Sequence, residues 1–252
     1  MKKLIYIILT ALLLAGCGKK GPLMPPGALV PAPVQNLLVQ QQGADFRITW
    51  QAPGKEQGGR PLRDLAGFRL QRRDIPPDGN DCAACPESWQ LLTAFDLDSP
   101  GETRKSGGTF IYYDRGLPPG SNSQYRLLAL SRSGGSSAPA TSPLKKMQPV
   151  VAAPAIEAVL RTGSIGIAFT FTPPAGAKLL GYNVYRRLSV AEPSVLPLNG
   201  APIPPPAWED QQLQFGQTYR YSATALVEIG GESVESLPSA EVELLYTLQE
   251  LR

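Results

Sequence analysis

Residues 65–73 read LAGFRLQRR, and residues 179–187 read LLGYNVYRR. Both stretches place an aromatic residue after a glycine, alternate apolar with polar residues, and end in two arginines. Alternation with a period of two is typical of a β-strand that buries one face, which here carries Phe68 in the first copy and Tyr182 in the second. The chain therefore contains a duplicated strand, and the neighbouring stretches of sequence are duplicated as well.

A second strand pattern comes before each copy and also ends in an aromatic residue. The first reads FRITW and ends at Trp50, three residues before a proline; the second reads IGIAFTF and ends at Phe171, three residues before a proline. The alternation puts both aromatic residues on the same face as the other large apolar side chains. We therefore assign Trp50 and Phe171 to equivalent core positions.

The match continues downstream without a gap. The segment from Tyr113 to Tyr125 aligns with the segment from Glu209 to Tyr221, and both contain an aspartate, a leucine and a glycine at matching positions. Each segment leads into an alternating strand followed by two adjacent glycines, which are typical of a hairpin turn. The duplicated unit is therefore a module of several strands.

This order of motifs resembles the fibronectin type III domain, and the resemblance covers nearly all of the chain after residue 33. It implies a tyrosine corner in the second module, formed by Leu213, Gly216 and Tyr219. Because Ser123 stands where Tyr219 stands, we expect a looser corner in the first module. Aromatic residues of such sandwiches belong in the core or at the corner. These are Trp50, Phe68, Tyr125, Phe171, Tyr182, Tyr219 and Tyr221.

We predict an all-β protein of two tandem fibronectin type III, immunoglobulin-like β-sandwiches. The 25 glycines and 26 prolines favour turns, and stretches with a helical period are scarce. Prolines between the modules predict a stiff connection and a rod-like pair. The expected divisions are a signal peptide (1–16), a lipidated cysteine with a proline-rich flexible tether (17–33), module 1 with a cysteine-containing insertion (34–148), module 2 (149–247) and a tail (248–252).

The N-terminus has the features of an export signal. Lys2 and Lys3 precede the apolar residues 4–14, a stretch too short to span a bilayer as a helix. The following Leu-Ala-Gly-Cys resembles the bacterial lipobox, which implies cleavage before Cys17 and a covalent lipid on this cysteine that anchors the protein in a membrane. By the same resemblance, Gly18 after the cysteine favours location at the outer membrane. The resemblance does not distinguish the periplasmic face of that membrane from the cell surface.

The tether carries a second resemblance. Residues 17–26, CGKKGPLMPP, are similar to the start of very small outer-membrane lipoproteins of the lipopolysaccharide-transport system. In that family the segment is linked to the transport barrel, which implies the same partner here. A proline-rich spacer that holds the modules away from the bilayer explains the same residues.

The composition excludes several classes of function. Histidine is absent, which removes Ser-His and Cys-His nucleophiles and the commonest transition-metal ligand. The formal net charge of +3 includes Lys2 and Lys3, so no basic field remains to hold nucleic acid. The sequence also lacks a phosphate-binding glycine loop. We expect no catalytic residue, no metal site and no cofactor apart from the lipid on Cys17, and therefore no enzyme.

The first module has two insertions, residues 54–65 and 74–108, and the second contains Cys82 and Cys85. An oxidising envelope favours a local disulfide between these thiols. The Cys-x-x-Cys spacing also leaves open a redox site and a metal site completed by a partner, whereas haem attachment needs histidine where Pro86 stands. Oxygen-bearing residues 78–81, DGND, are ordinary turn formers, although calcium ligands have the same chemistry.

We expect a non-enzymatic, membrane-anchored lipoprotein that acts as a structural or protein-binding module, with an unknown envelope protein or glycan as partner. Exposed sandwich edges offer one means of recognition, because they can accept a strand from a partner. The alternative is a polysaccharide-binding accessory protein. That role needs an exposed aromatic platform, for which Trp89, Trp208, Tyr112 and Tyr113 are the candidates.

Overall fold

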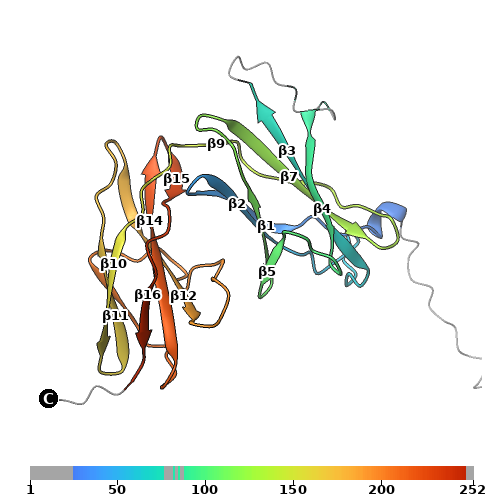
Figure 1. Ribbon diagram of the computed structural model, residues 1–252. Coiled ribbons are helices and arrows are strands. Elements are labelled where there is room, and N and C mark those ends of the chain that lie inside the picture. The colour runs from blue at the N-terminus through green and yellow to red at the C-terminus, as the bar shows by residue number, and fades with distance from the viewer. Residues whose placement is uncertain (1–24, 77–81, 83–84, 86–87, 248–252) are drawn as a thin grey trace, which may run out of the picture.

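The computed structural model describes residues 25–76, 82, 85 and 88–247, and Figure 1 shows their strands in two bodies that meet at one end. The predictions for Cys17, for the tether up to residue 24, for residues 78–81 and for the tail concern residues outside the described ranges. Within these ranges the regular structure is β-strand, apart from the 3-10 turn η1 (Pro26–Ala28). The protein is all-β, as expected.

The first module contains β1 (Gln35–Gln42), β2 (Asp45–Gln51), β3 (Leu65–Ile75), β4 (Gln90–Asp96), β5 (Arg104–Ser106), β6 (Thr109–Asp114), β7 (Asn122–Ser131), β8 (Ala140–Thr141) and β9 (Lys145–Lys146). The second contains β10 (Ala155–Arg161), β11 (Ser164–Thr170), β12 (Lys178–Leu188), β13 (Ala207–Asp210), β14 (Thr218–Ile229), β15 (Glu232–Glu235) and β16 (Val242–Leu245).

The core of the first module lies between two sheets. One contains β1, β2, β6 and β5, and the other contains β4, β3, β7, β8 and β9. Phe46, Ile48 and Trp50 of β2 are buried in turn, as the alternation in the sequence predicts. The Trp50 ring lies 5.6 Å from Phe68 and 5.7 Å from Phe110 between centroids, so aromatic contacts join the two sheets.

The second module repeats this arrangement with β10, β11 and β13 in one sheet and β12, β14, β15 and β16 in the other. Tyr182 is buried and stacks on Phe169, 4.3 Å away between centroids. Phe169 is thus the inward counterpart of Trp50, whereas Phe171 follows the end of β11 and is only partly buried against the core. The predicted equivalence of Phe171 with Trp50 was wrong by two residues. Alternation cannot detect such an error, because a shift of two residues keeps every side chain on the same face of the strand.

Each module contains the same arginine, aspartate and tyrosine contact between its sheets. In the first, the Tyr125 hydroxyl donates to Asp114 Oδ2 at 2.8 Å, and Arg72 donates to the same carboxylate at 2.9 Å. In the second, the Tyr221 hydroxyl donates to Asp210 at 2.8 Å, and Arg186 donates at 2.7 Å. Burial is the larger cause that raises the pKa of both tyrosines, and the nearby aspartate raises it further.

The corner before the sixth strand differs between the modules. In the second module the backbone N–H of Gln214 donates to the Tyr219 hydroxyl at 2.8 Å, which is the hydrogen bond of a tyrosine corner. Leu213 packs against the same core, and Gly216 has a φ of 79°, which suits glycine. In the first module Ser123 is fully buried and donates to Asp74 at 2.8 Å instead.

A continuous sheet joins the two modules. Strand β1 of the first module pairs in parallel with β15 of the second, through Gln41 opposite Val234 and Gln42 opposite Glu235. This pairing makes one eight-stranded sheet that crosses the junction. Figure 1 shows the strands of the two modules inclined to one another, so the expected rod-like pair is bent at the junction.

Candidate functional site

A groove of about 490 Å³ lies at the bend between the modules and is lined by residues of both. Its floor is the outer face of the eight-stranded sheet, where Tyr113 of β6 and Tyr185 of β12 come from different modules. Figure 1 places β5 on one side and β12 on the other, with the β1–β15 pairing at one end. Clefts between domains are common ligand sites, which makes this groove the candidate functional site.

A buried ionic network lies under the groove. Glu235 is fully buried, and its carboxylate accepts hydrogen bonds from Tyr185, from Thr224 and, at 3.1 Å, from Asn183. Arg47 comes from the first module and places Nη2 3.0 Å from the Glu235 carboxylate. Removing one partner of such a buried pair leaves an uncompensated charge, so the network resists separation of the modules.

The ionisation of this network follows from its burial. Burial raises the pKa of Tyr185, and the neighbouring Glu235 carboxylate raises it further. Burial alone lowers the pKa of Arg47, but Glu235 and Tyr185 outweigh burial and raise it above its usual value. Arg47 is therefore charged and Tyr185 neutral at physiological pH, which suits an Arg47 guanidinium that donates to the tyrosine hydroxyl at 3.0 Å.

Further contacts hold the modules together beside the network. The backbone N–H of Gly43 in the first module donates to the carbonyl of Glu235 in the second at 2.8 Å, and the Gln42 amide donates to the Tyr185 hydroxyl at 3.1 Å. Lys145 pairs with Glu232 at 2.8 Å. Because these bonds and the buried network all cross the junction, the two modules form one unit and the groove between them has a fixed shape.

The walls of the groove differ in chemistry. The first module contributes Arg104 and Arg115, both exposed. The second contributes Pro193 and Val195 from the segment after β12, and Leu237 from the segment after β15. Its own arginines on this surface, Arg187 and Arg220 among them, pair with Glu241 or Glu243. The first module's side thus carries two arginines beside Asp45, and the second module's side combines apolar residues with arginines that are already paired.

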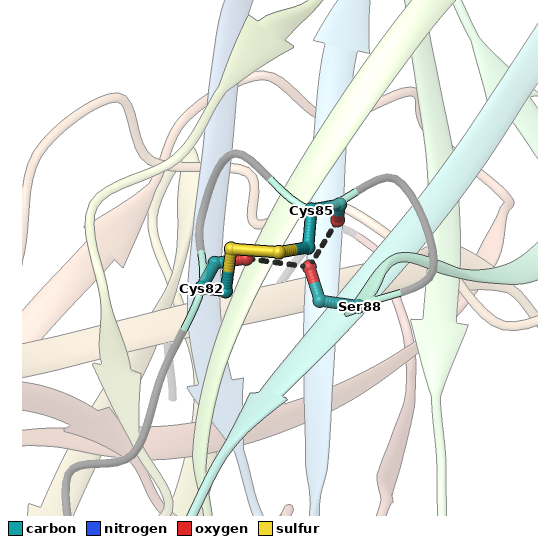
Figure 2. The surroundings of a disulfide bond; sticks show 3 residues. All are labelled: Cys82, Cys85 and Ser88. Atoms are coloured by element: carbon teal, nitrogen blue, oxygen red, sulfur yellow. Dashed lines mark hydrogen bonds between the residues drawn. A yellow bond between two sulfur atoms is a disulfide. The ribbon is translucent and has the colours of Figure 1, made fainter.

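The predicted disulfide forms outside the groove. Cys82 and Cys85 are bonded in the loop before β4, and Figure 2 shows Ser88 beside them. The Ser88 hydroxyl donates to the carbonyl of Cys82 at 3.0 Å and to that of Cys85 at 2.7 Å. The bridge therefore closes a compact turn, as a structural disulfide does.

The aromatic residues proposed for a sugar platform are not brought together. Trp89 precedes β4, and the guanidinium of Arg126 lies 4.4 Å from the centre of its ring. Trp208 belongs to β13 and packs partly buried against the second core. Tyr112 packs partly buried against the first core, and Tyr113 lines the groove. These side chains do not form a common stacking surface.

The sequence reasoning missed the groove and the network beneath it. Arg47 alternates with buried Phe46 and Ile48, a position that normally faces water. Glu235 follows a hairpin turn and has the same exposed appearance in the sequence. The sequence therefore gives no signal that Arg47 and Glu235 are in contact, because their pairing depends on how the two modules pack against each other.

Comparison with known proteins finds remote likeness to solved structures alone. No protein-family model and no curated protein matches the chain. Among solved structures, the twitchin kinase region of C. elegans matches with 15% identity and a TM-score of 0.32 over 47% of this chain. This match spans 17% of the twitchin structure.

Two chicken structures are similar over a longer range. The FN1–FN3 domains of chicken CNTN1 match with 14% identity and a TM-score of 0.34, covering 92% of this chain and 75% of theirs. The chicken interferon gamma receptor alpha chain matches with 13% identity and a TM-score of 0.31, covering 87% of this chain and 100% of the receptor chain. The strand order itself defines the class: this is a protein of two tandem fibronectin type III β-sandwiches.

Two searches of the described ranges bear on other classes of protein. No helix in them is long and apolar enough to cross a membrane. In the same ranges, no three acidic, cysteine or histidine side chains gather where they could hold a metal ion.

Proposed function

We propose that this chain is a non-enzymatic lipoprotein of the bacterial envelope whose two fixed sandwiches bind a partner in the junction groove. The observation that carries the proposal is the buried Arg47–Glu235 pair, with side chains 6% and 0% exposed, because it holds the two walls of one groove in place. A passive spacer of two modules needs no such contact. Fibronectin type III sandwiches are structural or binding units, and here the binding surface is built only when both modules are present.

The start of the described chain places the end of the proposed tether beside the first module. The backbone N–H groups of Gln57 and Gly58 donate to the carbonyls of Val30 and Ala28 at 2.8 Å, so the end of the tether lies along the first insertion. The nine residues from Cys17 to Pro25 reach at most about 30 Å when extended. A lipid on Cys17 thus keeps the first module within that distance of the bilayer surface, where the lipopolysaccharide-transport machinery is one possible neighbour of the tether.

The anchor is tested by labelling cells with an alkyne fatty acid. We expect label on the wild-type protein, loss of label in Cys17→Ala, and full label in the matched control Cys82→Ser. Fractionation of the same cells is expected to place the wild type in the outer membrane. An unlabelled wild-type protein contradicts the lipoprotein assignment.

The binding role is tested by photo-crosslinking in intact cells. A crosslinking residue replaces Ser194, which lines the groove, or Ser99, which is exposed on the first module away from it. We expect one discrete adduct from position 194 and none from position 99. No adduct from position 194, or the same adducts from both positions, contradicts the groove as the binding surface.

A further inference from the structure

Two arginines on the first module's side of the groove, Arg104 and Arg115, keep hydrogen-bond donors that no carboxylate among the described residues uses. Arg104 has no carboxylate within ion-pair distance among the described residues. Arg115 lies 3.8 Å from Asp45 and 3.9 Å from Glu102, beyond hydrogen-bond length in both cases. Both guanidinium groups therefore keep donors that an anionic ligand can use, and arginine suits carboxylates because its donors form a planar fork.

The arginines of the other module are already engaged. Arg186 pairs with Asp210 at 2.7 Å, and Arg187 pairs with Glu241. Beside these paired charges the module offers apolar surface: Leu237 is 43% exposed, and Val195 and Pro193 also line the groove. A ligand that fills the groove thus meets unused guanidinium donors from the first module and exposed apolar side chains from the second.

An extended polypeptide matches these two walls. Successive side chains of an extended chain point to opposite sides, so a segment in which acidic and apolar residues alternate directs one kind to each wall. The groove opens to solvent, which leaves a lipid acyl chain exposed to water but suits a peptide backbone that can remain hydrated. Charge complementarity and the open shape both favour the peptide.

We infer that the groove binds an extended polypeptide segment with alternating acidic and apolar residues, held by Arg104 and Arg115 on one side and by Val195 and Leu237 on the other. The inference rests on the proposed binding role of the groove and names the chemistry of the partner. Recognition uses side chains, because the floor is the face of a paired sheet and not a free strand edge.

The test measures fluorescence anisotropy of labelled peptides with the full-length protein in detergent. One peptide alternates glutamate with valine, a second replaces each glutamate by lysine, and a third has the first composition with all glutamates in one block. We expect saturable binding of the alternating acidic peptide that weakens with added salt, at least tenfold weaker binding of the block peptide, and none of the lysine peptide. Equal binding of the block peptide overturns the inference, because it marks a site for any polyanion.

Matched variants locate the site. The double variant Arg104→Glu/Arg115→Glu is expected to weaken binding at least tenfold, and Val195→Asp at least threefold. Arg63→Glu/Arg69→Glu makes the same change of charge at two exposed arginines outside the groove and is expected to stay within twofold of wild type. Equal losses in both double variants, or no binding to wild type, overturn the inference.

A vesicle of anionic phospholipid supplies the competing ligand. We expect it to leave peptide binding unchanged; displacement of the peptide assigns the groove to lipid and contradicts the inference. These assays use purified protein, so their failure is distinguishable from failure of the proposed function, which is read from fatty-acid labelling and crosslinking in cells.

Discussion

The two modules of this chain share the hydrogen bonds between their own sheets. They differ on the outer sheet face, which in the second module lies at the junction with the first. Arg72, Asp114 and Tyr125 of the first module have their counterparts in Arg186, Asp210 and Tyr221, with matching hydrogen bonds. On the outer face of the third strand the copies diverge. Tyr185 and Asn183 contact Glu235 at the junction, whereas Gln71 and Arg69 occupy the same places on a sheet face that no module covers.

The difference shows where duplication leaves room for new function. Inward positions are constrained by packing in both copies, because each module must fill its own core. Outward residues of the second module that lie at the junction, such as Asn183 and Tyr185, are instead buried where the two modules meet. The groove is a property of the pair, and neither module contains it alone.

The largest expected effect breaks the junction. Glu235→Ala leaves Arg47 buried without its partner, and we expect a loss of about 3–5 kcal/mol in the free energy of unfolding. Chemical denaturation followed by circular dichroism measures it. Glu228→Ala, an exposed site on β14, is the matched control and should change stability by less than about 0.5 kcal/mol. Equal effects of the two substitutions contradict a junction held by this pair.

The next prediction tests the shared contact. Tyr125→Phe and Tyr221→Phe each remove a hydroxyl that donates to a buried aspartate, and each is expected to cost about 1.5–3 kcal/mol. Because the contact is the same in both modules, the two costs should agree within about 1 kcal/mol. Denaturation curves of the two variants provide the comparison, and a negligible cost in one module shows that its copy of the contact has lost its role.

The third prediction concerns high pH. The raised pKa of Tyr185 means that its contribution to stability is complete below the ordinary tyrosine pKa of about 10 and is lost as the pH rises above that value. One such tyrosine accounts for about 1.4 kcal/mol per pH unit in that range. We expect Tyr185→Phe to reduce the slope of stability against pH between roughly pH 10 and 11 by that amount. An unchanged slope indicates that Tyr185 ionises in the folded protein as it does in the unfolded chain.

The smallest effect sharpens the contrast between the corners. Tyr219→Phe removes the acceptor for the Gln214 N–H and should cost about 1 kcal/mol. Ser123→Ala in the first module removes the donor to Asp74, which still bonds to Arg72, so we expect a smaller cost. Thermal unfolding of the two variants measures the difference, and a larger cost for Ser123→Ala contradicts the view that the first corner is the looser one.

Much of each module could be predicted from residues whose role is local. Trp50 and Phe68 alternate with polar neighbours, and both are fully buried as this period requires. Cys82 and Cys85 bond as expected because a short spacing gives them few other partners. The register of Phe171 failed because alternation fixes the face of a strand but not its position along the partner strand.

The sequence by itself determined an all-β chain, its duplication and most of its core aromatic residues, and it predicts an export signal and lipidation of Cys17. These depend on local periodicity and on short motifs, which need no knowledge of distant parts of the chain. The tertiary structure alone decided that β1 pairs with β15, that Arg47 meets Glu235, and that Arg104 and Val195 line one groove. These contacts join residues far apart in sequence, and their geometry follows from the angle at which two cores pack, which no local pattern encodes.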